Sequence, residues 1–153
     1  MEKGFCYQTP LGKIVLIENG SAVTRLIFSE VLPEGVNCTE TPLLKKAVLE
    51  LQEYFAGTRK RFDLPLSPQG TDFQQKVWKA LQDIPYGAVV SYKDIALAIG
   101  NEKACRAVGG ANNKNPIAII IPCHRVIGAD GSLVGYGGGL EIKRRLLALE
   151  KQK

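Results

Sequence analysis

The sequence has a single histidine, His124, among its 153 residues. Its four cysteines, Cys6, Cys38, Cys105 and Cys123, are scattered along the chain and form no C-x-x-C pair. Because structural zinc sites are built from clustered cysteine and histidine ligands, we expect no metal site. The cysteine spacing instead favours free thiols, as is usual in a reducing compartment.

Long apolar runs are also absent from the chain. No stretch approaches the ~20 consecutive apolar residues that span a bilayer. The first ten residues, MEKGFCYQTP, lack the apolar core of a secretory signal. We therefore expect no membrane partner, and a cytoplasmic location or a nuclear one in a eukaryotic cell.

Acidic residues are missing from one long segment. The chain carries a net charge of +5, and its sequence pI is about 9.1. Residues 103–125 hold four basic side chains, and no acid occurs between Glu102 and Asp130. A basic total favours a polyanionic partner only weakly, so the position of this basic segment is the more useful observation.

The first third of the chain has the pattern of strands followed by a helix. Two β-rich runs, residues 13–17 and 23–28, flank the pair Asn19-Gly20, which is a strong hairpin signal. Residues 41–57 have apolar residues at helical spacing, with Thr41 as a capping residue and glycine just past the end. The prolines and glycine of residues 63–70 then favour a domain boundary, and we place the domains at 1–65 and 66–153.

The second domain has the pattern of short helices and tight turns. A helix is expected from Thr71 to about Gln82. Ser91 and Asp94 have the spacing of a capping box, with Ile95, Ala98 and Ile99 forming the buried face of the helix they begin. Gly100 ends that helix, and another begins near Ala104. Two short helices with a glycine at the bend indicate a helix-turn-helix, whose second helix faces DNA.

Two segments of this domain leave alternatives open. Gly109 and Gly110 lie together in the second helix, where they either end it early or let a backbone or nucleotide approach closely. The run PIAIII, residues 116–121, is a buried strand or an extended segment. The glycine-rich residues 128–139 have neither a lysine nor phosphate-loop spacing, so they predict no nucleotide cradle, and we expect no cofactor.

Cys123 and His124 follow that apolar run. A lone cysteine there is usually a small buried hydrophobe. Its basic neighbourhood, which lowers a thiol pKa, and the adjacent imidazole favour a reactive thiol instead. Neighbours on a strand point to opposite faces, so a direct contact between the two side chains would need a bend or a bridging water.

Three more residues are candidates for chemistry or binding. Glu150 lies on the apolar side of a last helix expected from about 140 to 151, so it is either a buried partner of His124 or a surface acid. Tyr92 and Arg106 lie on the two helices of the helix-turn-helix. Each is either a contact to DNA or an ordinary packed or solvated side chain.

Four segments in matching order and spacing resemble one known family. The segments GAVVSYKDIA, RAVGGANNKNP, IPCHRVIG and GYGGGLEIKRRLLALE look like the O6-alkylguanine-DNA alkyltransferase family over residues 70–150. The resemblance implies an α+β protein. It would have a small antiparallel sheet with a helix, ribonuclease H-like, and a C-terminal winged helix-turn-helix domain.

The resemblance also implies a function. The protein would transfer the alkyl group of O6-alkylguanine, and of O4-alkylthymine, from double-stranded DNA to Cys123, once per molecule. It would bind the minor groove as a monomer, with cooperative binding along DNA an open question. The alternatives are a non-catalytic protein that binds alkylated DNA and a cysteine hydrolase. Neither the family's zinc-binding N-terminal variants nor its cysteine-lacking relatives match this sequence.

The family's residue roles carry over by position. Cys123 would be the alkyl acceptor, with His124 and Glu150 activating it through a water. Tyr92 would promote base flipping and donate to N3 of guanine, and Asn115 would brace the active-site turn. Arg106 would fill the gap left by the flipped base. The remaining DNA-facing positions are Ala107, Gly109, Gly110 and Lys114, and the substrate pocket is Val126, Tyr136, Gly137 and Gly138. Asn112 and Gly137 depart from the larger residues or serine common in the family.

Overall fold

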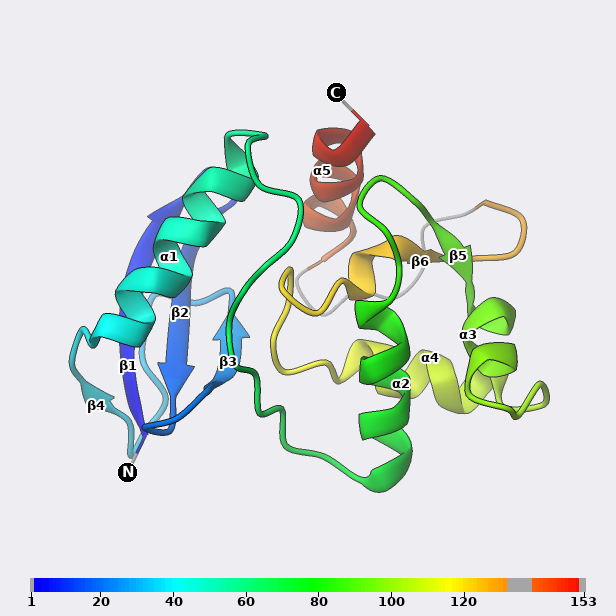
Figure 1. The fold of residues 1–153 in the computed structure, drawn as a ribbon, viewed down its shortest axis with the longest axis horizontal. Helices are drawn as coiled ribbons and strands as arrows, with labels where there is room; N and C mark the ends of the chain where they lie inside the picture. Colours follow the sequence, from blue (N-terminus) through cyan, green and yellow to red (C-terminus); the bar gives the residue numbers. More distant parts are fainter. Residues whose placement is uncertain (1, 132–138, 152–153) are drawn as a thin grey trace. The chain divides into compact units, whose positions relative to one another are not determined.

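The computed structural model describes residues 2–131 and 139–151. The chain divides into two compact units, Met1–Pro68 and Gln69–Lys153, within the stretch rich in proline and glycine. Figure 1 labels the helices and strands of both units. Each unit has its own buried apolar side chains and is described separately.

The first unit is a four-stranded sheet with one helix. Strands β1 (Lys3–Thr9), β2 (Gly12–Glu18) and β3 (Val23–Ile27) pair antiparallel in the order β3-β2-β1. The two-residue strand β4 (Asn37–Cys38) adds to β1 in parallel, so the sheet is not purely antiparallel as expected. Four consecutive residues of β2, 14–17, have no solvent exposure, which identifies it as the central strand.

The hairpin between β2 and β3 confirms the prediction from Asn19-Gly20. The side-chain Oδ1 of Asn19 accepts hydrogen bonds from the amides of Ser21 and Ala22, at 3.0 and 2.9 Å. Gly20 has φ of +100°, a backbone conformation that residues with a side chain rarely adopt. The turn therefore depends on this pair of residues.

Helix α1 (Pro42–Phe55) packs on β1 and β2 and lies along one face of the sheet (Figure 1). Its predicted ends are confirmed. Thr41 caps it by accepting a hydrogen bond from the Leu44 amide, and Gly57 follows with φ of +82°.

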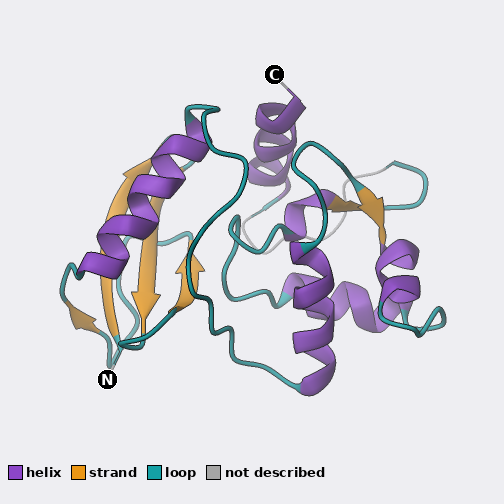
Figure 2. Cartoon of the chain, viewed as in Figure 1, coloured by secondary structure: helices purple, strands orange, loops and turns teal. Residues whose placement is uncertain are grey.

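The second unit is mainly helical (Figure 2). It contains α2 (Asp72–Gln82), α3 (Tyr92–Ala98), α4 (Cys105–Asn113) and α5 (Leu140–Lys151), together with the short 3₁₀ helix η1 (Cys123–Arg125). Helices α2, α3 and α4 pack against one another. The Trp78 indole, almost fully buried, donates to the Ala111 carbonyl at 2.8 Å and ties α2 to α4.

Helices α3 and α4 form the predicted helix-turn-helix. The predicted capping box of Ser91 and Asp94 begins α3, and α2 begins after Thr71 as expected, with a capping box there that was not predicted. The buried face of α3 was predicted wrongly in part: Ala98 is exposed, whereas Ala96 is buried beside Ile95. The reason is that α3 packs on both α2 and α4, which moves its buried face around the helix.

One small sheet was not predicted from the sequence, and the prediction of a strand or extended segment at residues 116–121 is wrong. Strands β5 (Val90–Ser91) and β6 (Val126–Ile127) pair in parallel just before α3 and just after η1. Residues 118–120 form a turn rather than a strand, with Ile119 at φ of +71°. β-Branched residues prefer extended backbone, but here side-chain hydrogen bonds from outside the segment outweigh that preference.

Candidate active site

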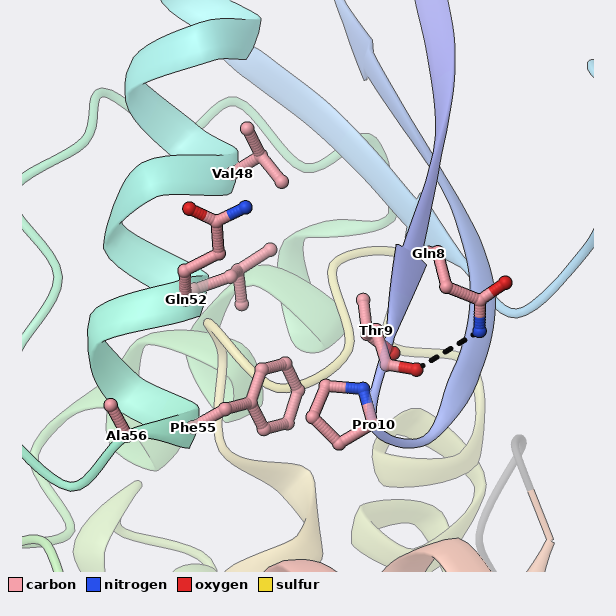
Figure 3. A pocket seen from close by; sticks show the side chains of 8 residues that line it. Gln8, Thr9, Pro10, Val48, Gln52, Phe55 and Ala56 are labelled. Atoms are coloured by element: carbon pink, nitrogen blue, oxygen red, sulfur yellow. Dashed lines mark hydrogen bonds between the residues drawn. The ribbon is translucent and has the colours of Figure 1, made fainter.

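A mainly apolar hollow in the first unit lacks reactive groups. It has a volume of about 300 Å³ and lies between α1 and the end of β1 (Figure 3). Its lining is Gln8, Thr9, Pro10, Val48, Leu51, Gln52, Phe55 and Ala56. None of these side chains is ionisable, so the candidate site is the Cys123 region of the second unit.

Cys123 and His124 lie in η1, not at the edge of a strand as expected. Both side chains are buried, with 3% and 0% exposure. The amide of Cys123 donates to the Ile121 carbonyl at 2.8 Å, and the amide of Val126 closes the turn on the Cys123 carbonyl. The two residues therefore occupy a tight turn.

Asn115 braces the turn that leads to Cys123. Its Nδ2 donates to the Ile121 carbonyl at 2.8 Å, and its Oδ1 accepts from the Ile117 amide at 3.0 Å. These bonds span the segment that contains Ile119, whose positive φ costs roughly 1–3 kcal/mol for a non-glycine residue. The amide side chain thereby sets the path of the chain into η1.

Glu150 is buried and paired with His124, which was one of the two open readings. Nε2 of His124 lies 2.7 Å from Oε2 of Glu150, and the two side chains have 0% and 1% exposure. A carboxylate only accepts hydrogen bonds, so Nε2 carries the proton and Nδ1 of the neutral ring is the basic nitrogen. Nδ1 is buried and has no hydrogen-bond partner among the described residues.

Arg125 holds the same carboxylate, which the sequence analysis missed. Its Nε donates to Oε1 of Glu150 at 2.8 Å and its Nη2 donates to Oε2 at 3.0 Å. Nη1 donates to the Ile84 carbonyl at 2.7 Å, and the guanidinium lies 5.8 Å from the centre of the Tyr86 ring. These contacts, all within residues 69–153, show that it clamps Glu150.

The expectation that basic neighbours lower the Cys123 pKa is wrong. Burial raises the pKa of Cys123 to about 11, and the smaller opposing effects come first from the Asn115 hydrogen bond and then from the Lys143 charge. Burial likewise lowers the pKa of His124, against the raising effect of Glu150. The resting site therefore holds a neutral thiol and a neutral imidazole. The number of basic residues near Cys123 in the sequence does not indicate how deeply the thiol is buried in the fold.

The DNA-facing candidates gather on α4 and at the start of α3. Arg106, Ala107, Gly110 and Lys114 are exposed, and Gly109 is half-buried. Helix α4 continues through both glycines to Asn113, so the alternative of an early helix end is wrong. A Cβ on Gly109 would lie 3.9 Å from the Tyr92 ring, whereas one on Gly110 would meet no atom within 4 Å.

Tyr92 begins α3 beside the Cys123 region. The phenol is half-buried. Burial raises its pKa, and the nearby Cys123 adds to the effect. The effect of Cys123 on the Tyr92 pKa indicates that the phenol lies near the thiol.

The predicted substrate pocket is described only in part. The Val126 side chain is buried and its carbonyl accepts a hydrogen bond from Nζ of Lys143 at 2.6 Å. Asn112 is buried, and its Nδ2 donates to the Cys123 carbonyl at 3.4 Å. Tyr136, Gly137 and Gly138 lie outside the described residues.

Comparisons with known proteins match both units of the chain. The family model for the "6-O-methylguanine DNA methyltransferase, DNA binding domain" matches residues 72–152, and the model for the "ribonuclease-like domain" of the same enzyme matches residues 5–68. In the part of the chain that the structure describes, no helix has the length and apolar character to cross a bilayer.

Relatives of similar length are also found. The chain is 52% identical over 152 residues to a protein of Bacillus subtilis named methylated-DNA–protein-cysteine methyltransferase, constitutive, covering 94% of this chain and 92% of that protein. A methyltransferase of the same name from Methanosarcina barkeri is 49% identical, with 94% of each chain covered. The crystal structure of Mycobacterium tuberculosis OGT in complex with DNA superposes with a TM-score of 0.91 at 50% identity, covering 97% of this chain and 92% of that one.

Proposed function

Because the chain belongs to the 6-O-methylguanine DNA methyltransferase family, we propose that Cys123 accepts the alkyl group of O6-alkylguanine in double-stranded DNA. The reaction is direct-reversal repair, with the protein itself as the acceptor. The observation that carries the assignment of Cys123 is the buried array beside it. This array consists of the 2.7 Å pair of His124 and Glu150, with Arg125 clamped on the same carboxylate.

The proposed step transfers one alkyl group and one proton. The thiol proton moves through one water to Nδ1 of His124, because Nε2 is already bonded to Glu150. The thiolate attacks the alkyl carbon, the S–C bond forms, and the C–O6 bond breaks. Its electron pair goes to guanine, and a hydrogen bond from Tyr92 to N3 reduces the negative charge that develops there. The thioether is stable, so each molecule reacts once.

The proposed DNA contacts use the exposed face of α4. A base within a duplex is inaccessible, so the alkylated nucleotide must leave the stack. Arg106 is exposed on α4 and fills the gap. Gly109 and Gly110 lack side chains, so the backbone of α4 can approach the minor groove closely. Ala107 and Lys114 also contact the DNA. Thymine alkylated at O4 offers the same alkyl–oxygen bond and is a second proposed substrate.

We further propose how guanine is recognised, where the domains divide and where the protein acts. The main-chain carbonyls of Cys123 and Val126 accept hydrogen bonds from the exocyclic amine of guanine. We place the domains at 1–65 and 66–153. The protein acts as a monomer in the cytoplasm, or in the nucleus of a eukaryotic cell, where its DNA substrate is.

Mass spectrometry of the intact protein separates these proposals from the alternatives. After incubation with a duplex that contains O6-methylguanine, the protein gains one methyl group, and peptide mapping places it on Cys123. Cys123→Ala binds the duplex without gaining mass. A cysteine hydrolase would release product repeatedly and leave the protein mass unchanged. Tight binding of the duplex by the wild-type protein with no mass change would overturn the proposal in favour of a non-catalytic binding protein.

A further inference from the structure

Lys143 is a fully buried lysine at the centre of the candidate site. Its relative exposure is 0%, and it lies on the face of α5 that packs against η1. Lysine is almost never completely buried, because removing the ammonium group from water is costly.

The Lys143 ammonium is bonded to Val126, the residue that closes the turn containing Cys123. Its Nζ donates to the Val126 carbonyl at 2.6 Å, and the amide of Val126 donates to the Cys123 carbonyl. Val126, which closes the 3₁₀ turn of Cys123 through its amide, therefore binds Lys143 through its carbonyl. Burial lowers the pKa of Lys143 from its usual value, and the Cys123 charge acts in the opposite direction. The Lys143 charge in turn acts to lower the pKa of Cys123, against the larger raising effect of burial.

The other groups around Cys123 supply no standing positive charge to a thiolate. Asn115, Asn112 and Tyr92 are uncharged. His124 is neutral at rest, because burial lowers its pKa. Arg125 donates two hydrogen bonds to Glu150, so its charge is matched by that carboxylate. Helix α2, which also packs on η1, buries Val77, Trp78 and Leu81 there and exposes its lysines.

We propose that Lys143 is the electrostatic partner of the Cys123 thiolate, held in place by the Val126 carbonyl. When the thiol proton leaves for His124, the negative charge on sulfur forms beside a positive charge that is already oriented. After alkylation the sulfur is neutral, and this stabilisation is lost. This inference rests on the proposed role of Cys123, and it assigns to Lys143 a role separate from the relay of His124 and Glu150.

The first test measures the ionisation of Cys123 without DNA. Carbamidomethylation by iodoacetamide is followed across pH, with the Cys123 peptide quantified separately from those of the other three cysteines. Lys143→Met should raise the pKa of Cys123 by about one unit, the low end for loss of a nearby opposite charge. Because a more basic thiolate is also more nucleophilic, the rate at a fixed lower pH should fall only about three- to fourfold.

Two variants control this test. Arg144→Met removes the same charge from an exposed position on α5 and should leave the Cys123 pKa unchanged. Lys143→Arg keeps a cation and should retain most of the wild-type behaviour. A folded Lys143→Met protein with the wild-type Cys123 pKa would overturn the inference, even if its stability had fallen.

The second test uses the wild-type protein, in case Lys143→Met does not fold. At alkaline pH, where Cys123 ionises, the thiolate opposes loss of the Lys143 proton. Methylation replaces that thiolate by a neutral thioether, so by linkage the pKa of Lys143 should fall on methylation. NMR titration of the lysine ε-methylene signals before and after reaction measures this change. An unchanged Lys143 titration would contradict the inference. Failure of wild-type Cys123 to take up a methyl group would instead contradict the proposed function.

Discussion

Nε2 of His124 lies 2.7 Å from Oε2 of Glu150, and this contact joins two buried side chains 26 residues apart in the chain. It forms because α5 docks against η1, with Glu150 on the inner face of the helix. Arg125 and the Gly87 amide donate to the same carboxylate. Glu150 thus orients the imidazole while its own position is fixed from two other sides.

Replacing Glu150 by glutamine should slow alkyl transfer and raise the pKa of Cys123. An amide does not match the donors of Arg125 and no longer favours the His124 tautomer whose Nδ1 is basic. We expect the single-turnover rate on an O6-methylguanine duplex to fall by about 10- to 100-fold, the range for weakened general base catalysis. Stability should also fall, by about 3–5 kcal/mol, because Arg125 keeps a buried, uncompensated charge.

Glu141→Gln is the matched control for that experiment. Glu141 is an exposed acid on the same helix and pairs only at the surface with Arg144. Its loss should change stability by less than about 1 kcal/mol and leave the transfer rate unchanged. A wild-type pH–rate profile for folded Glu150→Gln would remove Glu150 from the proton relay.

Replacing Arg106 by alanine should impair duplex repair much more than reaction with the free base. Only the duplex requires a base to leave the stack, so the free base O6-benzylguanine does not need Arg106. We expect a loss of at least about tenfold on the duplex, the cost of a few kcal/mol of unstacking, and less than twofold on the free base. Lys103→Ala, which removes one charge from a nearby exposed position, controls for simple phosphate attraction. Equal losses on both substrates would contradict the role of Arg106.

Stability should decline at alkaline pH because Cys123 is buried as a thiol. Below the ordinary thiol pKa of 9.0 the cysteine is protonated in the folded and unfolded states. Between 9.0 and about 11 the unfolded thiol ionises first, so rising pH favours unfolding. The contribution lost across this window is about 2–3 kcal/mol.

Chemical denaturation of wild-type protein and Cys123→Ala from pH 8 to pH 11 isolates this effect. Other groups titrate in both proteins, so the difference between the two curves reports the thiol. The wild-type free energy of unfolding should decline more steeply than that of Cys123→Ala. Parallel curves would show that the pKa of Cys123 is not raised by folding.

Local sequence signals predicted most of the secondary structure. The signals at Asn19-Gly20, Thr41, Thr71 and Ser91 act through side-chain hydrogen bonds to residues two or three positions away, so their effect is visible in the sequence. The run from 116 to 121 misled the prediction, because its conformation depends on the side chain of Asn115 rather than on the preference of isoleucine for strands. Strands β5 and β6 were missed because two residues give no periodic pattern.

The sequence by itself determined the candidate residues of the site, because the segments around Cys123, Tyr92 and Arg106 carry a specific family pattern. Only the tertiary structure decided which of those side chains are protonated and charged. In the folded protein, burial raises the pKa of Cys123, Arg125 is hydrogen-bonded to Glu150, and Lys143 has no solvent exposure. The physical reason is that the desolvation of these side chains depends on how α2, α5 and η1 pack around them. The separation of residues along the chain does not indicate how closely those elements pack.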